Sequence, residues 1–251
     1  METLYIVVPC YNEEEVLPGS SQIMAEKLNS LKNSGTVSAR SRIMLVDDGS
    51  ADSTWGIINS LHTDAPDTFD GVRLRCNRGH QNALLAGLML AKDLADAAVS
   101  MDADLQDDIN AVDDMIHAYD GGAHIVCGVR RSRETDTFLK RTTARGYYKL
   151  MNIFGAKLIY DHADFRLMDT RALNALSMYH GDDLFLRGLI TRLGFEPALV
   201  EYDRSPRMAG ESKYTLKKML RLAASGLGCA GLRPQSVPRP ADPYIEKVLH
   251  V

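Results

Sequence analysis

Residues 97–106 read A-A-V-S-M-D-A-D-L-Q, an apolar run that turns directly into an acidic loop. The run from Ala97 to Val99 is typical of a buried strand, and Asp102 and Asp104 follow its end. Two carboxylates at positions i and i+2 offer hard oxygen ligands to a divalent cation that keeps open positions for phosphate oxygens. An Asp-x-Asp pair also occurs in ordinary solvated turns, so the surrounding sequence has to decide between these interpretations.

The same order of a short β-rich run and a helical pattern recurs along the chain. The predicted strands are 4–8, 43–46, 72–75, 97–101 and 125–129, and the predicted helices are 13–31, 53–61, 81–94, 110–119 and 138–154. Such alternation is typical of parallel strands joined by crossover helices. The sequence therefore predicts an α/β fold with a mostly parallel sheet flanked by helices.

Polar loops follow the first four predicted strands. Because the carboxyl ends of parallel strands meet at one edge of a sheet, we expect these loops to converge on one ligand site. They are residues 9–13, 47–50, 77–81 and 102–106.

Composition excludes several classes of protein. The chain has 251 residues, of which 45% are hydrophobic and 25% charged, as in a soluble globular protein with one large domain. A net charge of -4 argues against a nucleic-acid partner. The four cysteines form no Cys-x-x-Cys pair, which favours a reducing compartment, and no apolar run reaches the roughly 18 residues of a membrane span.

Charge is segregated along the chain. Residues 102–120 hold seven Asp and no Lys or Arg, whereas residues 130–149 hold seven Lys or Arg against Glu134 and Asp136. An acidic metal site followed by a basic anion site would have this pattern, and two ordinary solvated faces are the alternative. Further on, four of the nine prolines fall within residues 234–243, so we expect a domain over residues 1–224 and a poorly ordered extension over residues 225–251.

Six ordered motifs carry a family resemblance. They are V-V-P-C-Y-N-E-E-E (7–15), L-V-D-D-G-S-A-D-S-T (45–54), N-R-G-H-Q-N-A-L-L-A-G (77–87), M-D-A-D-L-Q-D (101–107), D-F-R-L-M-D (164–169) and R-M-A-G-E-S-K-Y (207–214). In this order they resemble family 2 inverting glycosyltransferases with the GT-A fold, and within them the polyprenyl-phosphate glycosyltransferases. That group includes dolichyl-phosphate mannose synthases and bactoprenol-phosphate glucosyltransferases, and D-F-R-L-M-D leans toward the second. The resemblance covers about residues 1–222.

The resemblance implies a donor site built from the first two loops. Its nucleoside pocket would be lined by Pro9, Tyr11 and Glu13, and its base and ribose would contact Asp47 and Asp48. Simpler roles are a strand end at Pro9, helix-starting acids from Glu13 onward and an Asx turn at Asp47.

The acidic loop is implied to hold the metal and the diphosphate. Asp102, Asp104 and Gln106 would hold Mg²⁺ or Mn²⁺, and Asp102 and Ala103 would also contact the donor. His80 is expected near the donor, whereas Asp107 is expected at a solvated helix start.

Basic residues further along are implied to bind phosphate groups. Arg207, Ser212 and Lys213 resemble a segment that closes on the donor diphosphate, with an exposed basic loop as the alternative. Arg130 and Arg141 are candidates for holding the phosphate of the lipid acceptor.

Asp164 and Arg166 are the predicted catalytic pair, because Asp164 lies where the family's proposed base lies. Positions i and i+2 of an extended segment share one side, so the two side chains should be neighbours. A phosphate monoester has a second pKa of about 6 and needs orientation more than proton removal. We therefore expect Asp164 to position Arg166 or the sugar.

Leu216, Met219, Leu220 and Ala223 share one face of a basic amphipathic helix that would end the domain. Such a helix suits an anionic membrane surface or a protein core equally well. Relatives in this branch usually continue into transmembrane helices here, and the chain as given does not. The expected location is cytoplasmic, peripheral at the inner face of the membrane.

Together these features imply a metal-dependent, inverting transfer of a hexose from a nucleoside diphosphate sugar to a polyprenyl phosphate. UDP-glucose or UDP-N-acetylglucosamine is the favoured donor. The alternatives are a GDP-mannose-dependent activity like that of dolichyl-phosphate mannose synthase, and a non-catalytic nucleotide-sugar-binding scaffold. The expected partners are the sugar nucleotide, the lipid and the membrane surface, with no nucleic acid and with a homo-oligomer left open.

Overall fold

The computed structural model describes residues 1–131, 162–181, 184–204, 233–239 and 242–250. Within them, one sheet is formed by β1 (Leu4–Cys10), β2 (Arg42–Asp47), β3 (Phe69–Leu74), β4 (Ala97–Ser100), β5 (Ile125–Arg130), β6 (His162–Asp169), β7 (Ala198–Tyr202) and β8 (Ile245–Leu249). The helices are α1 (Leu17–Asn33), α2 (Thr54–Asp64), α3 (His80–Leu94), α4 (Ala111–Asp120), α6 (Thr170–Ser177) and α7 (Leu186–Ile190). The predicted alternation of strands and helices is confirmed from β1 to β5.

The sheet has the order β7-β5-β6-β4-β1-β2-β3-β8. Its centre, β4-β1-β2-β3, is parallel throughout, and β5 pairs in parallel with β7. β6 lies between β4 and β5 and is antiparallel to both. A mostly parallel sheet is therefore confirmed, and the carboxyl ends of β1, β2 and β4 lie at one edge, as the pairs Cys10 with Asp47 and Val7 with Ser100 show.

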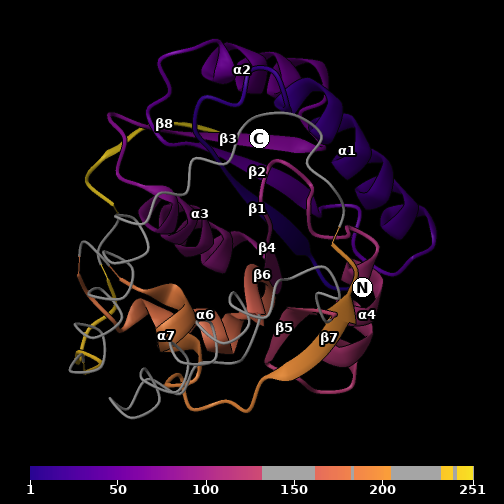
Figure 1. Ribbon diagram of the computed structural model, residues 1–251, viewed down its shortest axis with the longest axis vertical. Helices are drawn as coiled ribbons and strands as arrows, with labels where there is room; N and C mark the ends of the chain where they lie inside the picture. Colours follow the sequence, from indigo (N-terminus) through magenta and orange to yellow (C-terminus); the bar gives the residue numbers. More distant parts are fainter. Residues whose placement is uncertain (132–161, 182–183, 205–232, 240–241, 251) are drawn as a thin grey trace, which may run out of the picture.

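Helices cover both faces of the sheet (Figure 1). One face packs against α1, α2 and α4, and the other packs against α3, α6 and α7. Successive residues of β1 alternate between these layers, with Ile6 and Val8 on the first and Tyr5 and Val7 on the second. Burial on both faces explains why the central strands are continuous apolar runs without polar alternation.

The helix α1 begins four residues later than the sequence pattern predicts. Glu13 to Glu15 precede the helix, and the Glu13 carbonyl accepts hydrogen bonds from the backbone N–H groups of Val16 and Leu17. Pro18 then falls in the first turn, where a helix tolerates a residue without a backbone N–H. The acidic residues are thus left in the loop at the carboxyl edge.

The expectation of a poorly ordered extension is wrong for residues 245–249. These residues form β8, which pairs antiparallel with β3, for example Val72 with Val248. The backbone N–H of Arg75 also donates to the carbonyl of Tyr244. The prolines of this region all lie within residues 234–243, so every residue of 245–249 keeps a backbone N–H that can donate. The otherwise open edge of β3 supplies the hydrogen-bond partners.

Candidate active site

The loops after β1 and β2 converge, as the sequence predicts. The backbone N–H of Asn12 donates to Ser50 Oγ at 2.9 Å, and that of Glu13 donates to Thr54 Oγ1 at 2.8 Å. Pro9 is buried in β1, whereas Tyr11 is 40% exposed beside these contacts. The aromatic ring predicted for the nucleoside pocket is therefore accessible to a ligand.

The two carboxylates at the end of β2 are buried and have different partners. Asp48 accepts from the backbone N–H groups of Arg78 at 2.6 Å and Gly79 at 2.9 Å. Asp47 Oδ1 accepts from the Ser50 N–H at 3.1 Å, whereas its Oδ2 has no hydrogen bond and lies 3.7 Å from Arg73 Nε. Burial raises the pKa of both carboxyl groups. Asp48 thus fixes the loop before α3, and Asp47 has one oxygen that makes no hydrogen bond.

Gly49 allows these two loops to approach each other. Its φ is 65°, and a Cβ on this residue would lie 2.5 Å from the carbonyl carbon of Cys76. Gly49→Ala is expected to lower the free energy of unfolding by about 2 kcal/mol or more, because left-handed strain and a backbone clash add. Urea denaturation measures this, with Gly56→Ala as the control because a Cβ there meets nothing within 4 Å. Equal stability of the two variants would contradict the close approach.

The acidic loop turns sharply after β4. The Leu105 N–H points back to the Asp102 carbonyl at 3.4 Å, and the φ of Leu105 is 47°. Asp104 Oδ1 accepts from the backbone N–H of Gln106 at 3.3 Å, and Gln106 Oε1 accepts from Arg204 Nη2. The turn places Asp102 toward α3, while Gln106 already has a basic partner.

One feature of Asp102, a buried oxygen without a hydrogen bond, would suit a metal ion. Within the described ranges, no three His, Cys, Asp or Glu side chains are grouped closely enough to hold an ion. Asp102 is 42% exposed overall, yet its Oδ1 is buried and has no hydrogen bond. Burial raises the pKa of Asp102, opposed by the charge of His80 and reinforced by neighbouring carboxylates. A buried carboxylate oxygen that makes no hydrogen bond suits a divalent cation, but this oxygen lies 3.5 Å from His80 Nε2, a cationic neighbour with which a metal would compete. The metal set Asp102, Asp104 and Gln106 stays a prediction.

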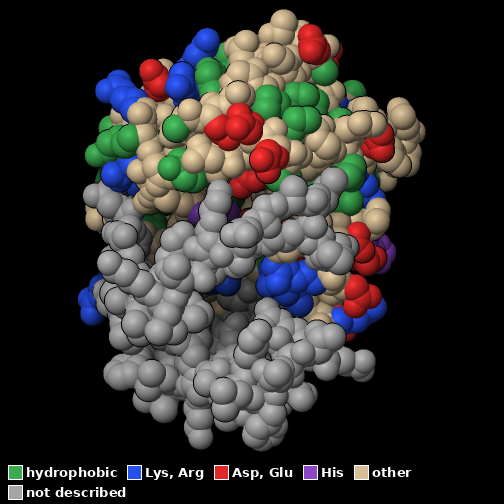
Figure 2. All heavy atoms as spheres, turned by 45° about the horizontal axis from the view of Figure 1, so that its top comes forward, with side chains coloured by type: hydrophobic (Ala, Val, Ile, Leu, Met, Phe, Trp, Pro, Cys, Tyr) green, Lys and Arg blue, Asp and Glu red, His purple; other side chains and the backbone are tan. Residues whose placement is uncertain are grey.

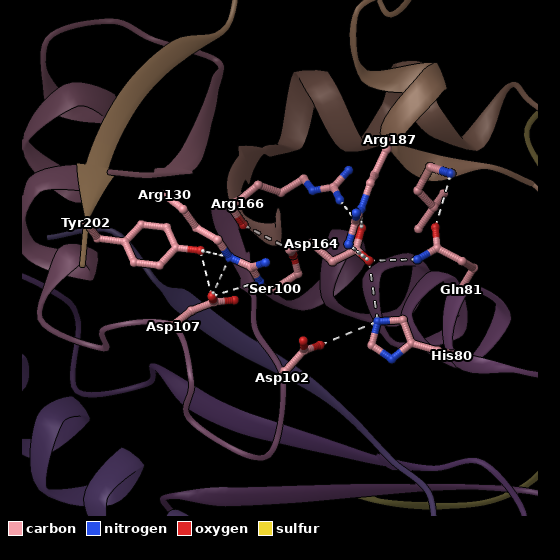
Figure 3. A network of polar contacts seen from close by, with 11 residues as sticks. His80, Gln81, Ser100, Asp102, Asp107, Arg130, Asp164, Arg166, Arg187 and Tyr202 are labelled. Carbon is pink, nitrogen blue, oxygen red and sulfur yellow. Dashed lines mark hydrogen bonds and ion pairs between the residues drawn. The ribbon is translucent and has the colours of Figure 1, made fainter. Parts of the chain in front are cut away.

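Asp164 is the centre of a polar network (Figure 3). Asp164 is 6% exposed, and its carboxylate accepts from Nη2 of the buried Arg166, two residues further along β6. Arg187 donates through Nε at 3.2 Å and through Nη2 at 3.0 Å, and Gln81 donates at 2.9 Å. His80 Nε2 lies 3.6 Å from Asp164 and 3.5 Å from Asp102. The predicted pairing of Asp164 with Arg166 agrees with these contacts.

The charges of this network favour an anionic ligand. Burial would raise the pKa of Asp164, but Arg187, the hydrogen bond with His80, and Arg166 outweigh it and hold this pKa well below its usual range. Burial lowers the pKa of His80, but Asp164 and Asp102 outweigh this and raise it to about 9. Three cationic side chains thus face two carboxylates at neutral pH. A carboxylate held in this way is a poor base.

Asp164 should make folding stability sensitive to acid. Its pKa is depressed in the folded state, so its contribution is complete above the unfolded pKa of about 4 and is lost as pH falls toward the folded value. We expect the difference in free energy of unfolding between the wild type and Asp164→Asn to persist at pH 5 and to shrink below about pH 4. Urea denaturation at each pH measures it, and a difference that vanishes by pH 6 would contradict the depressed pKa.

Sequence reasoning missed four residues of this network. Gln81 joins Asp164 to the start of α7, since its Oε1 accepts from the Leu186 N–H at 3.2 Å, and Arg187 follows on that helix. Gln81 lies within one of the six motifs and could have been found there, whereas Arg187 lies 18 positions beyond the nearest motif, 164–169, and carries no such signal. The other two are Asp107 and Tyr202, which contact Arg130.

The expectation that Asp107 lies at a solvated helix start is wrong. Its side chain is 3% exposed, and its Oδ1 accepts from the Tyr202 hydroxyl at 2.6 Å and from Arg130 Nη2 at 3.2 Å. The strand β7 is responsible, because pairing with β5 brings Tyr202 beside Arg130. The candidate acceptor residue Arg130 is thus held at the carboxyl edge, next to the acidic loop.

Several predictions fall outside the described residues. They concern Arg141, Arg207, Ser212, Lys213 and the amphipathic pattern over residues 216–223. In the part of the chain that is described, none of the helices combines the length and the apolar character needed to cross a bilayer. Figure 2 shows acidic and basic side chains mixed over the upper part of one face, and a further group of Lys and Arg side chains lower on it.

Comparison with solved structures defines the class of fold. Glucosyl-3-phosphoglycerate synthase from Mycobacterium tuberculosis, solved with Mn²⁺, UDP and glucosyl-3-phosphoglycerate, matches with a TM-score of 0.58 at 16% identity, over 99% of this chain and 90% of that one. Mannosyl-3-phosphoglycerate synthase from Rubrobacter xylanophilus matches with a TM-score of 0.58 at 18% identity, over 91% and 72%. The fold is the GT-A fold of glycosyltransferases.

Sequence comparison then gives the family. Residues 5–177 match Glycosyl transferase family 2. The uncharacterized glycosyltransferase YkoT of Bacillus subtilis is 50% identical over 231 residues, which cover 92% of this chain and 68% of the relative. A prophage bactoprenol glucosyl transferase homolog of Escherichia coli is 35% identical over 223 residues, covering 88% and 70%. The chain belongs to glycosyltransferase family 2 and is a glycosyltransferase.

Proposed function

We propose that this enzyme transfers a hexose, with glucose favoured, from a UDP-sugar to a polyprenyl phosphate with inversion at the anomeric carbon. One observation carries the proposal: at the carboxyl edge of the sheet, Asp102 of the acidic loop faces the network around Asp164, with His80 between them (Figure 3). Relatives named bactoprenol glucosyl transferase support both the sugar and the lipid carrier. UDP-N-acetylglucosamine is the other favoured donor, and GDP-mannose is the runner-up.

The donor would bind along the first four loops. Tyr11 would pack against the base, and Asp47 Oδ2, which makes no hydrogen bond and lies near Arg73, would accept one from base or ribose. Pro9 and Glu13 complete this pocket in the proposal, and Asp48 acts by fixing the loop that carries His80. Ala103 is buried in the turn beside Asp102, where backbone and diphosphate would meet.

Asp102 and Asp104, with Gln106, would hold Mg²⁺ or Mn²⁺, and a bound dication stabilises the charge of the leaving diphosphate. A solved neighbour of the same fold contains Mn²⁺ and UDP. Arg207 and Lys213 would add basic groups and Ser212 a hydroxyl at the donor diphosphate; all three lie outside the described residues.

The chain's own residues account for the transfer itself. A phosphate oxygen of the acceptor attacks the anomeric carbon while the bond to the nucleoside diphosphate breaks, and the lipid phosphate, with a second pKa of about 6, is already largely deprotonated. Asp164 stays ionised and paired, so its proposed role is to hold Arg166 and Arg187 in place near the reacting charges. Arg130 and Arg141 are the proposed contacts of the acceptor phosphate.

A polyprenyl acceptor implies work at a membrane surface. We propose a peripheral position at the cytoplasmic face, with the basic pattern over residues 216–223 as the contact. Flotation with vesicles that contain about 30% anionic lipid tests this part separately, at low and at high salt.

The function is tested with purified protein, Mg²⁺ or Mn²⁺, a short polyprenyl phosphate and three radiolabelled donors, namely UDP-glucose, UDP-N-acetylglucosamine and GDP-mannose. We expect labelled lipid with a UDP-sugar and the inverted anomer by NMR. Labelled lipid with GDP-mannose and with no other donor would show that GDP-mannose is the donor. No labelled lipid with any donor, together with calorimetric binding of UDP, would favour a non-catalytic scaffold.

A further inference from the structure

A buried contact joins Asp107, Arg130 and Tyr202, which come from three separate elements (Figure 3). Asp107 follows the acidic loop, Arg130 ends β5 and Tyr202 ends β7. Asp107 Oδ1 accepts from the Tyr202 hydroxyl at 2.6 Å, from Arg130 Nη2 at 3.2 Å and from Arg130 Nε at 3.4 Å. Asp107 and Tyr202 are each only 3% exposed. The contact is therefore largely shielded from the solvent screening that weakens surface ion pairs.

The surroundings keep Tyr202 and Arg130 in the protonated forms that the contact needs. Burial and the charge of Asp107 raise the pKa of Tyr202, so its hydroxyl stays protonated and donates. Burial would lower the pKa of Arg130, but the charge of Asp107 outweighs this and raises it. Arg130 thus remains a cation next to a neutral hydroxyl.

The contact also orients the guanidinium group. Nε and Nη2 of Arg130 donate to Asp107 and Tyr202, whereas Nη1 makes no hydrogen bond with any described residue. A guanidinium has five N–H donors, so one edge stays available to a ligand. Tyr202 is itself fixed, because Phe165 packs edge-on against its ring at 5.3 Å. Rigid partners on one edge leave the other edge pre-organised.

We propose that Asp107 and Tyr202 are positioning residues that hold Arg130 for the phosphate group of the acceptor. This rests on the proposed function, in which Arg130 binds that phosphate. Arginine pairs with phosphate oxygens through two parallel N–H groups, and this geometry fails if the guanidinium rotates. Because Asp107 follows Gln106 directly, the same contact sets the acceptor residue in register with the acidic loop.

Tyr202→Phe tests the proposal, because it keeps the ring against Phe165 and removes only the hydroxyl. Farnesyl phosphate is the short acceptor. We expect its calorimetric Kd and its KM in the transfer assay to rise about tenfold, since a hydrogen bond to a charged group is lost. The kcat at saturating acceptor and the Kd for UDP with Mn²⁺ should change less than about twofold. A purely structural role would alter all of these together.

The matched control is Tyr179→Phe, which also removes a buried hydroxyl, one that donates to the Arg192 carbonyl at 3.3 Å. It should leave both acceptor constants unchanged. Arg130→Gln should weaken farnesyl phosphate binding by itself, and adding Tyr202→Phe to it should cause no further loss, because the two residues act as one unit. An additional tenfold loss in the double variant would overturn the positioning role.

The remaining outcomes separate the two proposals. If farnesyl phosphate binds the wild type and Arg130→Gln weakens it, but Tyr202→Phe binds normally, the positioning role is overturned and the proposed function stands. If Arg130→Gln also binds normally, or if the wild type does not bind farnesyl phosphate at all, the acceptor role of Arg130 is overturned and the positioning role with it. Inorganic phosphate is the second ligand: an equal proportional loss supports recognition of the phosphate group, and a loss with farnesyl phosphate alone would place the effect at the prenyl chain and overturn the proposal.

Discussion

Asp104→Asn is expected to reduce turnover by about 10²–10³-fold while the protein stays folded, because an amide is a weaker ligand than a carboxylate for a hard dication. Asp104 lies in the turn after β4, outside any strand or helix, and its Oδ1 accepts from the Gln106 N–H, from which an amide oxygen can accept as well. The measurements are the initial rate of labelled lipid formation and the midpoint of urea denaturation. We expect the urea midpoint of the variant to equal that of the wild type and its initial rate to be strongly reduced.

The control for this substitution is Asp114→Asn, which makes the same change of charge in the same acidic stretch. Asp114 is exposed in the first turn of α4 and should leave the rate within about twofold of the wild type. Full activity of Asp104→Asn in excess Mg²⁺ would show that Asp104 is dispensable. Loss of folding in Asp104→Asn would show that its role is structural.

Asp164→Asn should have the largest effect on stability, lowering the free energy of unfolding by about 3–5 kcal/mol. Arg166 is 1% exposed and would be left in the core with no carboxylate, because Asp164 is its counter-charge. The same substitution should lower turnover by about 100-fold or more, since Arg166 and Arg187 lose the group that holds them in place. Urea denaturation at pH 7 and the transfer assay measure the two effects.

The double variant Asp164→Asn with Arg166→Met separates stability from activity. Removing the uncompensated cation together with the carboxylate should restore more than half of the lost stability, because apolar replacement of a buried ion pair is often close to neutral. Turnover should stay low. An Asp164→Asn variant that is as stable as the wild type would contradict the ion pair, and a double variant that regains activity would contradict the role of Arg166.

The sequence by itself determined the class of fold and the edge that carries the site. Apolar runs buried on both faces and the helical patterns between them required a mostly parallel sheet, and the motif loops at 9–13, 47–50, 77–81 and 102–106 then had to meet. The i, i+2 spacing of Asp164 and Arg166 in a strand likewise fixed their common side. These inferences succeed because they depend on local periodicity and on one general rule of α/β topology.

Only the tertiary structure decided which side chains complete the site. Arg187 reaches Asp164 because Gln81 anchors the start of α7, and Tyr202 reaches Asp107 because β7 pairs with β5. The strand β8 exists because the edge of β3 offers it unpaired backbone groups. Each of these depends on partners far apart in the chain, and neither periodicity nor composition contains that information. A solvated acid and a buried one look alike in sequence, so the burial of Asp107 became visible only with its neighbours in place.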